Sequence, residues 1–137
     1  MKKMLAFAAA VILVVTTGCS QTPKANMGDN NGPQIKFDTV AYDYGNVQLG
    51  GNGVHEFVFE NTGTKPLVLS NVRSSCGCTI PEWPKDPIKS GEKASIKVKY
   101  DTRRVGPFSK SITVYSNAGT APVVVLRIKG TVSQAAK

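Results

Sequence analysis

The amino-acid sequence predicts an all-β fold, an antiparallel β-sandwich of about seven strands. Apolar and polar residues alternate with a period of two in several segments, as in 94–100, where Ile96, Val98 and Tyr100 alternate with polar residues. Turn-forming Gly, Pro and Asn residues separate these segments at regular intervals. Beyond residue 18, no segment shows the sustained 3.6-residue apolar stripe of a helix. Together these patterns are typical of a sandwich.

The predicted strands are short and rich in β-branched and aromatic residues, as strands usually are. They cover residues 35–45, 54–61, 66–72, 94–100, 109–117 and 123–132. The turn at 62–65 predicts a hairpin between 54–61 and 66–73, in which His55 pairs with Val72. A cysteine-containing loop and a proline-rich connection follow this hairpin, and Trp83 in that connection is expected to cover the same end of the sandwich.

The first 18 residues are predicted to be a signal peptide that is removed. Lys2 and Lys3 precede an apolar stretch, residues 4–15, which is too short to cross the ~30 Å hydrocarbon core of a bilayer. Small residues then lead to Cys19. The segment 16–19 resembles a bacterial lipobox, which implies that Cys19 is lipidated and becomes the first residue. Ser20 resembles a signal for sorting to the outer membrane, with the domain facing the periplasm.

Four regions are predicted along the chain. The signal peptide covers 1–18, the lipidated cysteine and a flexible linker 19–33, the folded domain 34–133 and a short tail 134–137. The linker is polar and rich in Asn, Gly and Pro. About fourteen flexible residues give a root-mean-square reach on the order of 20 Å. We therefore expect a domain that is anchored near a membrane and searches its surroundings locally.

Charge and motif content argue against several classes of function. Removal of Lys2 and Lys3 with the signal peptide lowers the formal net charge from +8 to +6. The remaining lysines are scattered rather than clustered with aromatic residues, which indicates a solvated surface, and an exported protein does not meet nucleic acid. One histidine and the absence of a G-x-S-x-G sequence argue against a serine hydrolase, and no phosphate-binding loop is present. We expect a protein that is not an enzyme and has no small-molecule substrate.

Cys76 and Cys78, separated by Gly77, admit three interpretations. The cysteines are small hydrophobic residues in a loop where Gly77 adopts a positive φ. Alternatively they form a disulfide, for which an oxidising compartment is favourable. On an extended strand their Cα atoms would be roughly 6.5–7 Å apart, at the limit for bonding. As a third possibility, two thiolates suit a soft ion such as Cu(I).

His55 is the only histidine in the chain and a weak candidate for a metal ligand. In the predicted hairpin it lies at the same end as the cysteine loop, roughly 13 Å from Cys76. It also shares a strand face with Phe57 and Phe59. We therefore interpret it as a residue at the edge of the core and expect no metal site.

Several motifs together resemble one bacterial family, the domain of unknown function fifteen seventy-three, which is frequent in exported proteins. The resemblance covers residues 35–132 and implies an immunoglobulin-like sandwich, similar to major sperm protein and Hydin-type domains. It implies no activity. The motifs are FxFxNTG (57–63), KPLVLSNVRSSCGCT (65–79), PxWPxxPIKSGE (81–92), Gly-Pro-Phe (106–108), Ser-Asn (116–117) and IKGTV (128–132).

The sequence thus predicts a non-enzymatic lipoprotein of the cell envelope that acts as a protein-binding or scaffold module. Its expected partners are the membrane, through the lipid on Cys19, and another envelope protein. No cofactor is expected besides that lipid. The alternative is a thiol-redox or Cu(I)-binding periplasmic protein that acts through Cys76 and Cys78.

Overall fold

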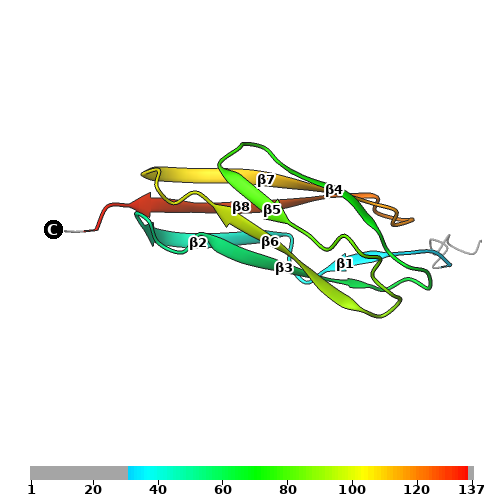
Figure 1. Cartoon of the computed structure of the whole chain (residues 1–137). Coiled ribbons are helices and arrows are strands. Elements are labelled where there is room, and N and C mark those ends of the chain that lie inside the picture. Colours follow the sequence, from blue (N-terminus) through cyan, green and yellow to red (C-terminus); the bar gives the residue numbers. More distant parts are fainter. Residues whose placement is uncertain (1–30, 136–137) are drawn as a thin grey trace, which may run out of the picture.

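The computed structural model of this protein describes residues 31–135 (Figure 1). The predicted signal peptide, Cys19 and most of the predicted linker lie outside the described residues, so lipidation stays a prediction. The described residues form eight strands and no helix. Within them, therefore, no helix is long and apolar enough to span a membrane.

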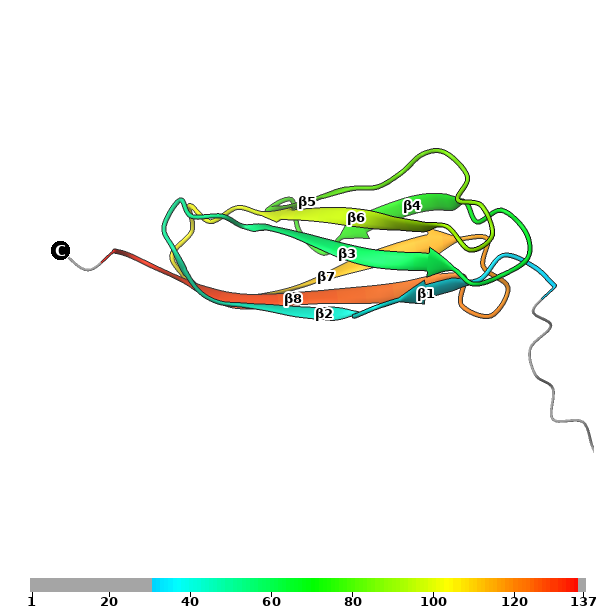
Figure 2. The ribbon, with the colours of Figure 1, turned by 90° about the horizontal axis from the view of Figure 1, so that it is seen from below.

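The eight strands form two four-stranded sheets packed face to face, which confirms the predicted β-sandwich (Figures 1 and 2). One sheet has the order β1-β3-β6-β5 and the other the order β2-β8-β7-β4. Neighbouring strands are antiparallel except β2 and β8, which run parallel. The strands are β1 (Ile35–Phe37), β2 (Ala41–Gln48), β3 (Val54–Asn61), β4 (Leu69–Ser74), β5 (Thr79–Glu82), β6 (Lys93–Tyr100), β7 (Gly106–Ser116) and β8 (Val123–Ser133).

The core lies between the sheets and consists of the alternate residues that the sequence pattern identified. Ile96, Val98 and Tyr100 of β6 are at most 5% exposed, while Ile112 and Val114 of β7 are fully buried. Removal of such side chains from water is the main stabilising contribution to a fold of this kind. The prediction that period-two segments bury one face is therefore confirmed for β6 and β7.

Two predictions about the strands were wrong. The predicted strand 35–45 divides at Asp38–Val40, and its halves β1 and β2 belong to opposite sheets. The predicted hairpin of 54–61 with 66–73 does not form, because β3 and β4 also lie in opposite sheets. His55 pairs with Val98 of β6 rather than with Val72. Alternation shows which side chains of a strand are buried, but it does not show to which of the two sheets the strand belongs.

The chain enters the domain at one end of the sandwich. The carbonyl of Gly32 accepts a hydrogen bond from Thr64, and the carbonyl of Pro33 accepts one from Gly119. These contacts begin two residues before Gln34, the predicted start of the domain. At the far end, Leu49 donates to Ser133 at the close of β8. Figure 1 shows the start of β1 and the end of β8 at opposite ends of the long axis.

Candidate functional site: the disulfide loop and its groove

Cys76 and Cys78 form a disulfide in the loop between β4 and β5. Their Cα atoms are 5.3 Å apart, closer than an extended strand would place them and well within the range for bonding. The loop therefore turns rather than continuing β4. Of the three interpretations of the motif, the structure favours the bridged form. Both cysteines are half-buried, and Cys78 packs against the hydrophobic core.

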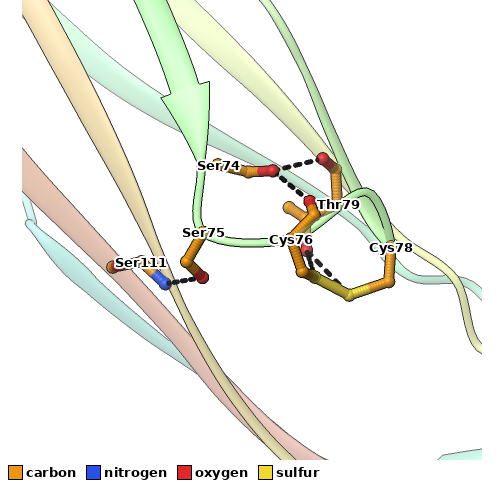
Figure 3. Close-up of a disulfide and its surroundings, with 6 residues drawn as sticks. All are labelled: Ser74, Ser75, Cys76, Cys78, Thr79 and Ser111. Atoms are coloured by element: carbon orange, nitrogen blue, oxygen red, sulfur yellow. Dashed lines mark hydrogen bonds between the residues drawn. A yellow bond between two sulfur atoms is a disulfide. The ribbon is translucent and has the colours of Figure 1, made fainter.

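Short polar side chains hold the loop from both sides (Figure 3). The Ser74 hydroxyl donates to the carbonyls of Cys76 and Thr79, the latter at 2.7 Å. On the other side, Ser75 bonds to Ser111 of β7 through its backbone N–H at 2.8 Å and accepts from the Ser111 N–H at 3.2 Å. The disulfide loop is thus held by β4 and β7 of one sheet and by β5, an edge strand of the other sheet.

The hydroxyl of Thr79 is close to both sulfur atoms. Its Oγ1 lies 3.9 Å from the sulfur of Cys76 and 4.0 Å from the sulfur of Cys78. A disulfide carries no S–H, so the hydroxyl must be the donor in either contact. Thr79 is 3% exposed, and the donor is therefore shielded from competing water.

Gly77, at the tip of the loop, does not have the positive φ that the sequence suggested. Among residues 31–135, the glycines with positive φ are Gly45, Gly50, Gly91 and Gly106. A Cβ atom added to Gly77 would also meet nothing within 4 Å. Neither backbone conformation nor internal packing therefore requires glycine at this position, in contrast to Gly63, where an added Cβ would overlap the carbonyl oxygen of Gly32.

A groove of about 660 Å³ lies beside the disulfide. Gly77 and Cys78 form one side of it, and Ile80, whose side chain is 59% exposed, lies next to them. The loop 50–53 and the segment 99–103 form the rest. The backbone joins these parts, because Asp101 donates to the carbonyl of Cys78 at 2.9 Å and Gly50 donates to Thr102 at 3.1 Å.

The charges of this groove are one carboxylate and two cations. Asp101 and Arg103 form an ion pair at 3.0 Å, and the hydrogen bond from Arg103 lowers the pKa of the Asp101 carboxyl. Lys99 contributes a further positive charge beside Ile80, its partner across β5 and β6. The groove therefore carries a small positive excess, which favours an anionic group on a ligand.

His55 is not part of this site. It lies on β3, on the other side of β6 from the β5 strand that follows the disulfide loop. Its ring stacks on Tyr42 with ring centres 3.5 Å apart and meets Phe57 edge-on at 4.7 Å. Burial lowers the pKa of His55 below its ordinary value of 6.5, with the Glu56 carboxylate opposing the shift. Nearby, burial raises the pKa of Tyr44 to about 12.

The remaining predictions from the sequence, which concern Trp83 and metal binding, do not add to the disulfide groove. Trp83 follows the end of β5 that lies away from the disulfide, so it does not cover the cysteine loop. Its ring is half-buried and carries the Lys85 ammonium 3.0 Å from its centre. Within residues 31–135, no three His, Cys, Asp or Glu side chains lie together as metal ligands. The bridged cysteines would have to be reduced before they could bind Cu(I) as thiolates.

Sequence reasoning identified the two cysteines but missed most of the groove. Ser74 and Thr79 directly flank the motif, and their small hydroxyl side chains were a signal that the loop is tied down locally. The loop 50–53 was interpreted only as a turn. It lies more than twenty residues from the cysteines in the sequence, and no short-range pattern could have placed it beside them.

The comparisons with known proteins bear on the family and the fold. A family model described as "Protein of unknown function (DUF1573)" matches residues 35–132. Among curated proteins, no sequence matches this one significantly.

Solved structures show the same architecture. A protein of unknown function from Porphyromonas gingivalis W83 has a TM-score of 0.66 at 17% identity, over 74% of this chain and 48% of that one. This chain therefore spans about half the length of that protein. PapD-like domain 7 of human CEP192 has a TM-score of 0.67 at 11% identity, over 87% and 98% of the two chains. The CsuC–CsuE chaperone–adhesion subunit complex of Acinetobacter baumannii gives 0.53 at 13%, over 74% and 57%. At such identities the likeness concerns the fold alone.

Proposed function

Since the chain belongs to the DUF1573 family and has an immunoglobulin-like sandwich, we propose that it is a non-enzymatic, lipid-anchored binding module of the cell envelope. In this proposal Cys19 carries the lipid, the linker spaces the domain from the periplasmic face of the outer membrane, and a protein partner binds the distal end. The partner is another envelope protein. No nucleic acid, small-molecule substrate or cofactor has a role.

The observation that carries this proposal is the placement of the groove relative to the linker. The chain enters at Gly32–Pro33, beside the loop that follows β3, whereas the groove includes Gly53, directly before β3. The length of β3, roughly 23 Å at 3.3 Å per residue, separates the two. A domain held by its N-terminal linker would present the groove and the disulfide loop away from the membrane. Loops on a rigid scaffold are common places for recognition.

Site-specific photo-crosslinking in intact cells tests the proposal. A photo-reactive residue in place of Ile80, which is 59% exposed in the groove, is expected to give a discrete crosslinked partner. The matched control replaces Val123, which is 51% exposed and lies at the start of β8, at the linker end. A Cys19→Ala variant should be released from the membrane fraction. Equal crosslinking at both positions, or none at Ile80 in repeated experiments, would contradict the proposal.

A second function is favoured by the disulfide itself. A bridge that encloses one residue restricts the unfolded chain very little, so stabilisation does not account for its presence. It lies half-exposed beside a groove with a positive excess. We propose as the alternative that Cys76 and Cys78 exchange disulfides with thiols in the envelope, or bind Cu(I) when reduced.

Alkylation and mass spectrometry of protein taken directly from the envelope test this alternative. Free thiols are blocked first, and thiols released by a reductant are labelled second. A redox role predicts a mixture of bridged and free forms that shifts with growth under reducing conditions. If the pair stays fully bridged in every condition, and the Cys76→Ser/Cys78→Ser variant binds Cu(I) and behaves in cells like the parent, the alternative is excluded.

A further inference from the structure

We propose that the groove admits a peptide-borne cysteine thiol to the sulfur of Cys78, and that glycine is present at position 77 to keep this approach open. The inference rests on the thiol-exchange function proposed above and deepens it. It assigns the attacked sulfur, the departing sulfur and the class of substrate.

Gly77 is not required by the local structure. A glycine is usually explained by a positive φ or by close packing. Neither holds here, because the φ of Gly77 is not positive and an added Cβ would point into open space. A side chain at position 77 would therefore leave the interior of the domain undisturbed and stand in open space at the side of the groove that Gly77 lines. What it would change is the access of another molecule to the disulfide.

Cys78 lines the groove together with Gly77, and Cys76 does not. A thiolate that occupies the groove therefore meets Cys78 first. The groove has a volume of about 660 Å³, which falls within the general size range of ligand pockets. The excess positive charge from Lys99, beside the paired Asp101 and Arg103, favours the approach of a thiolate.

The incoming thiolate forms a bond to the sulfur of Cys78, the Cys76–Cys78 bond breaks, and its electron pair leaves on the sulfur of Cys76. The Thr79 hydroxyl, 3.9 Å from the Cys76 sulfur and shielded from water, can donate to the thiolate that forms. A second thiol then displaces Cys78, so that two thiols are oxidised to a disulfide and the protein disulfide is reduced to two thiols.

The test uses the full-length protein purified from membranes in detergent, with glutathione as the peptide thiol and 2-mercaptoethanol as the small thiol. Exchange is stopped with excess iodoacetamide, which alkylates the free thiolates, and fragmentation mass spectrometry locates the adduct. Parent protein should carry glutathione on Cys78 and the iodoacetamide label on Cys76. The Gly77→Leu variant should exchange with glutathione about tenfold more slowly than the parent does. Its exchange with 2-mercaptoethanol should be slowed much less, because the small thiol needs less room.

Gly32→Leu is the matched control, because Gly32 also lacks a positive φ, an added Cβ there meets nothing within 4 Å, and it lies at the linker end. Its exchange rates should equal those of the parent. Gly77→Ala should fall between the parent and Gly77→Leu. Glutathione on Cys76, or equal rates for Gly77→Leu and Gly32→Leu, overturns the inference while leaving thiol exchange as a function. If the parent disulfide exchanges with neither thiol, the underlying redox proposal fails as well.

Discussion

The side chain of His55 shows how a single residue can fit the core and still respond to pH. The ring lies between the sheets, stacked on Tyr42 of β2 and against Phe57 of its own strand. The neutral ring suits this aromatic environment, and burial disfavours the charged form. The sequence placed His55 correctly at the edge of the core. It could not predict Tyr42 as the stacking partner, because that contact depends on the division of 35–45 between two sheets.

The free energy of unfolding should depend on the charge of His55. Its pKa is lower in the folded than in the unfolded state, so between the two values the unfolded chain binds more protons. The free energy of unfolding should therefore decrease as the pH falls below about 6.5 and level off beneath the folded pKa. Urea unfolding at pH 7.5 and pH 5.5, followed by the fluorescence of the single tryptophan, measures the change.

The control for this prediction is His55→Phe, which keeps a flat ring at the stack but does not titrate. Because His55 is the only histidine, the decrease between pH 7.5 and 5.5 should be absent from this variant. Asp43 and Asp101 do not interfere, because their pKa values are lowered from 3.8 and the stability they contribute is lost only at more acidic pH. A decrease of the same size in His55→Phe would contradict the assignment.

In the turn after β3, the hydrogen bonds show why particular residues are needed. Asn61 is fully buried and uses its whole amide. It donates to the carbonyls of Lys65 and Ile88 and accepts from the N–H groups of Gln34 and Gly63. One side chain thus joins the entering chain, the turn after β3 and the segment before β6. This accounts physically for Asn61 and Gly63 in the motif at 57–63.

Removal of the Asn61 amide should destabilise the domain far more than removal of a comparable exposed amide. Asn61→Ala leaves the buried N–H groups of Gln34 and Gly63 without this acceptor and removes one donor from the Ile88 carbonyl, which keeps its bond from Leu67. We expect a loss of about 3 kcal/mol in the free energy of unfolding. Asn117→Ala is the matched control. Asn117 is exposed and bonds to Val68 and Pro66, so its loss should cost about 1 kcal/mol. Equal losses for the two variants in urea unfolding would show that the buried Asn61 amide contributes no more to stability than the exposed Asn117 amide.

The strands could be predicted in part from the sequence, for reasons that differ between them. β3 has the predicted bounds, and β6, β7 and β8 differ from theirs by up to three residues, because alternation and flanking turns mark them clearly. β5 was missed, since Thr79–Glu82 contains a proline and no alternation. Pairing with β6 forms this strand, and Pro81 lies at an edge of the sheet, where a missing N–H is tolerated. Long-range pairing of this kind leaves no local signal.

At the scale of the whole molecule, the fold is held by packing between two sheets rather than by its disulfide. The buried side chains of both sheets form a single hydrophobic cluster. The bridge joins residues two apart, so it removes little entropy from the unfolded chain. The resemblance of the motifs to a known family predicted the architecture of this molecule. That the groove lies at the end opposite the linker could be learned only from the three-dimensional structure.

The Cys76→Ser/Cys78→Ser variant should therefore fold and unfold cooperatively. We expect the free energy of unfolding to fall by less than about 2 kcal/mol relative to the bridged parent. Urea unfolding of both proteins, with the oxidised state of the parent verified by alkylation, gives the comparison. A variant that shows no cooperative transition would mean that the bridge is a structural requirement.

The parallel pairing of β2 with β8 has a mechanical consequence. The chain enters at Gly32, and the groove lies at the other end of strands that run along the same axis. A pull between the linker and a partner held in the groove would act along the strands. The pull would reach the groove loop 50–53 through β1 and β2, so the three register pairs of β1 with β3 and the six of β2 with β8 would resist sliding together. With the proposed lipid anchor and the proposed groove partner both in place, a domain loaded in this way would transmit tension between them without unzipping.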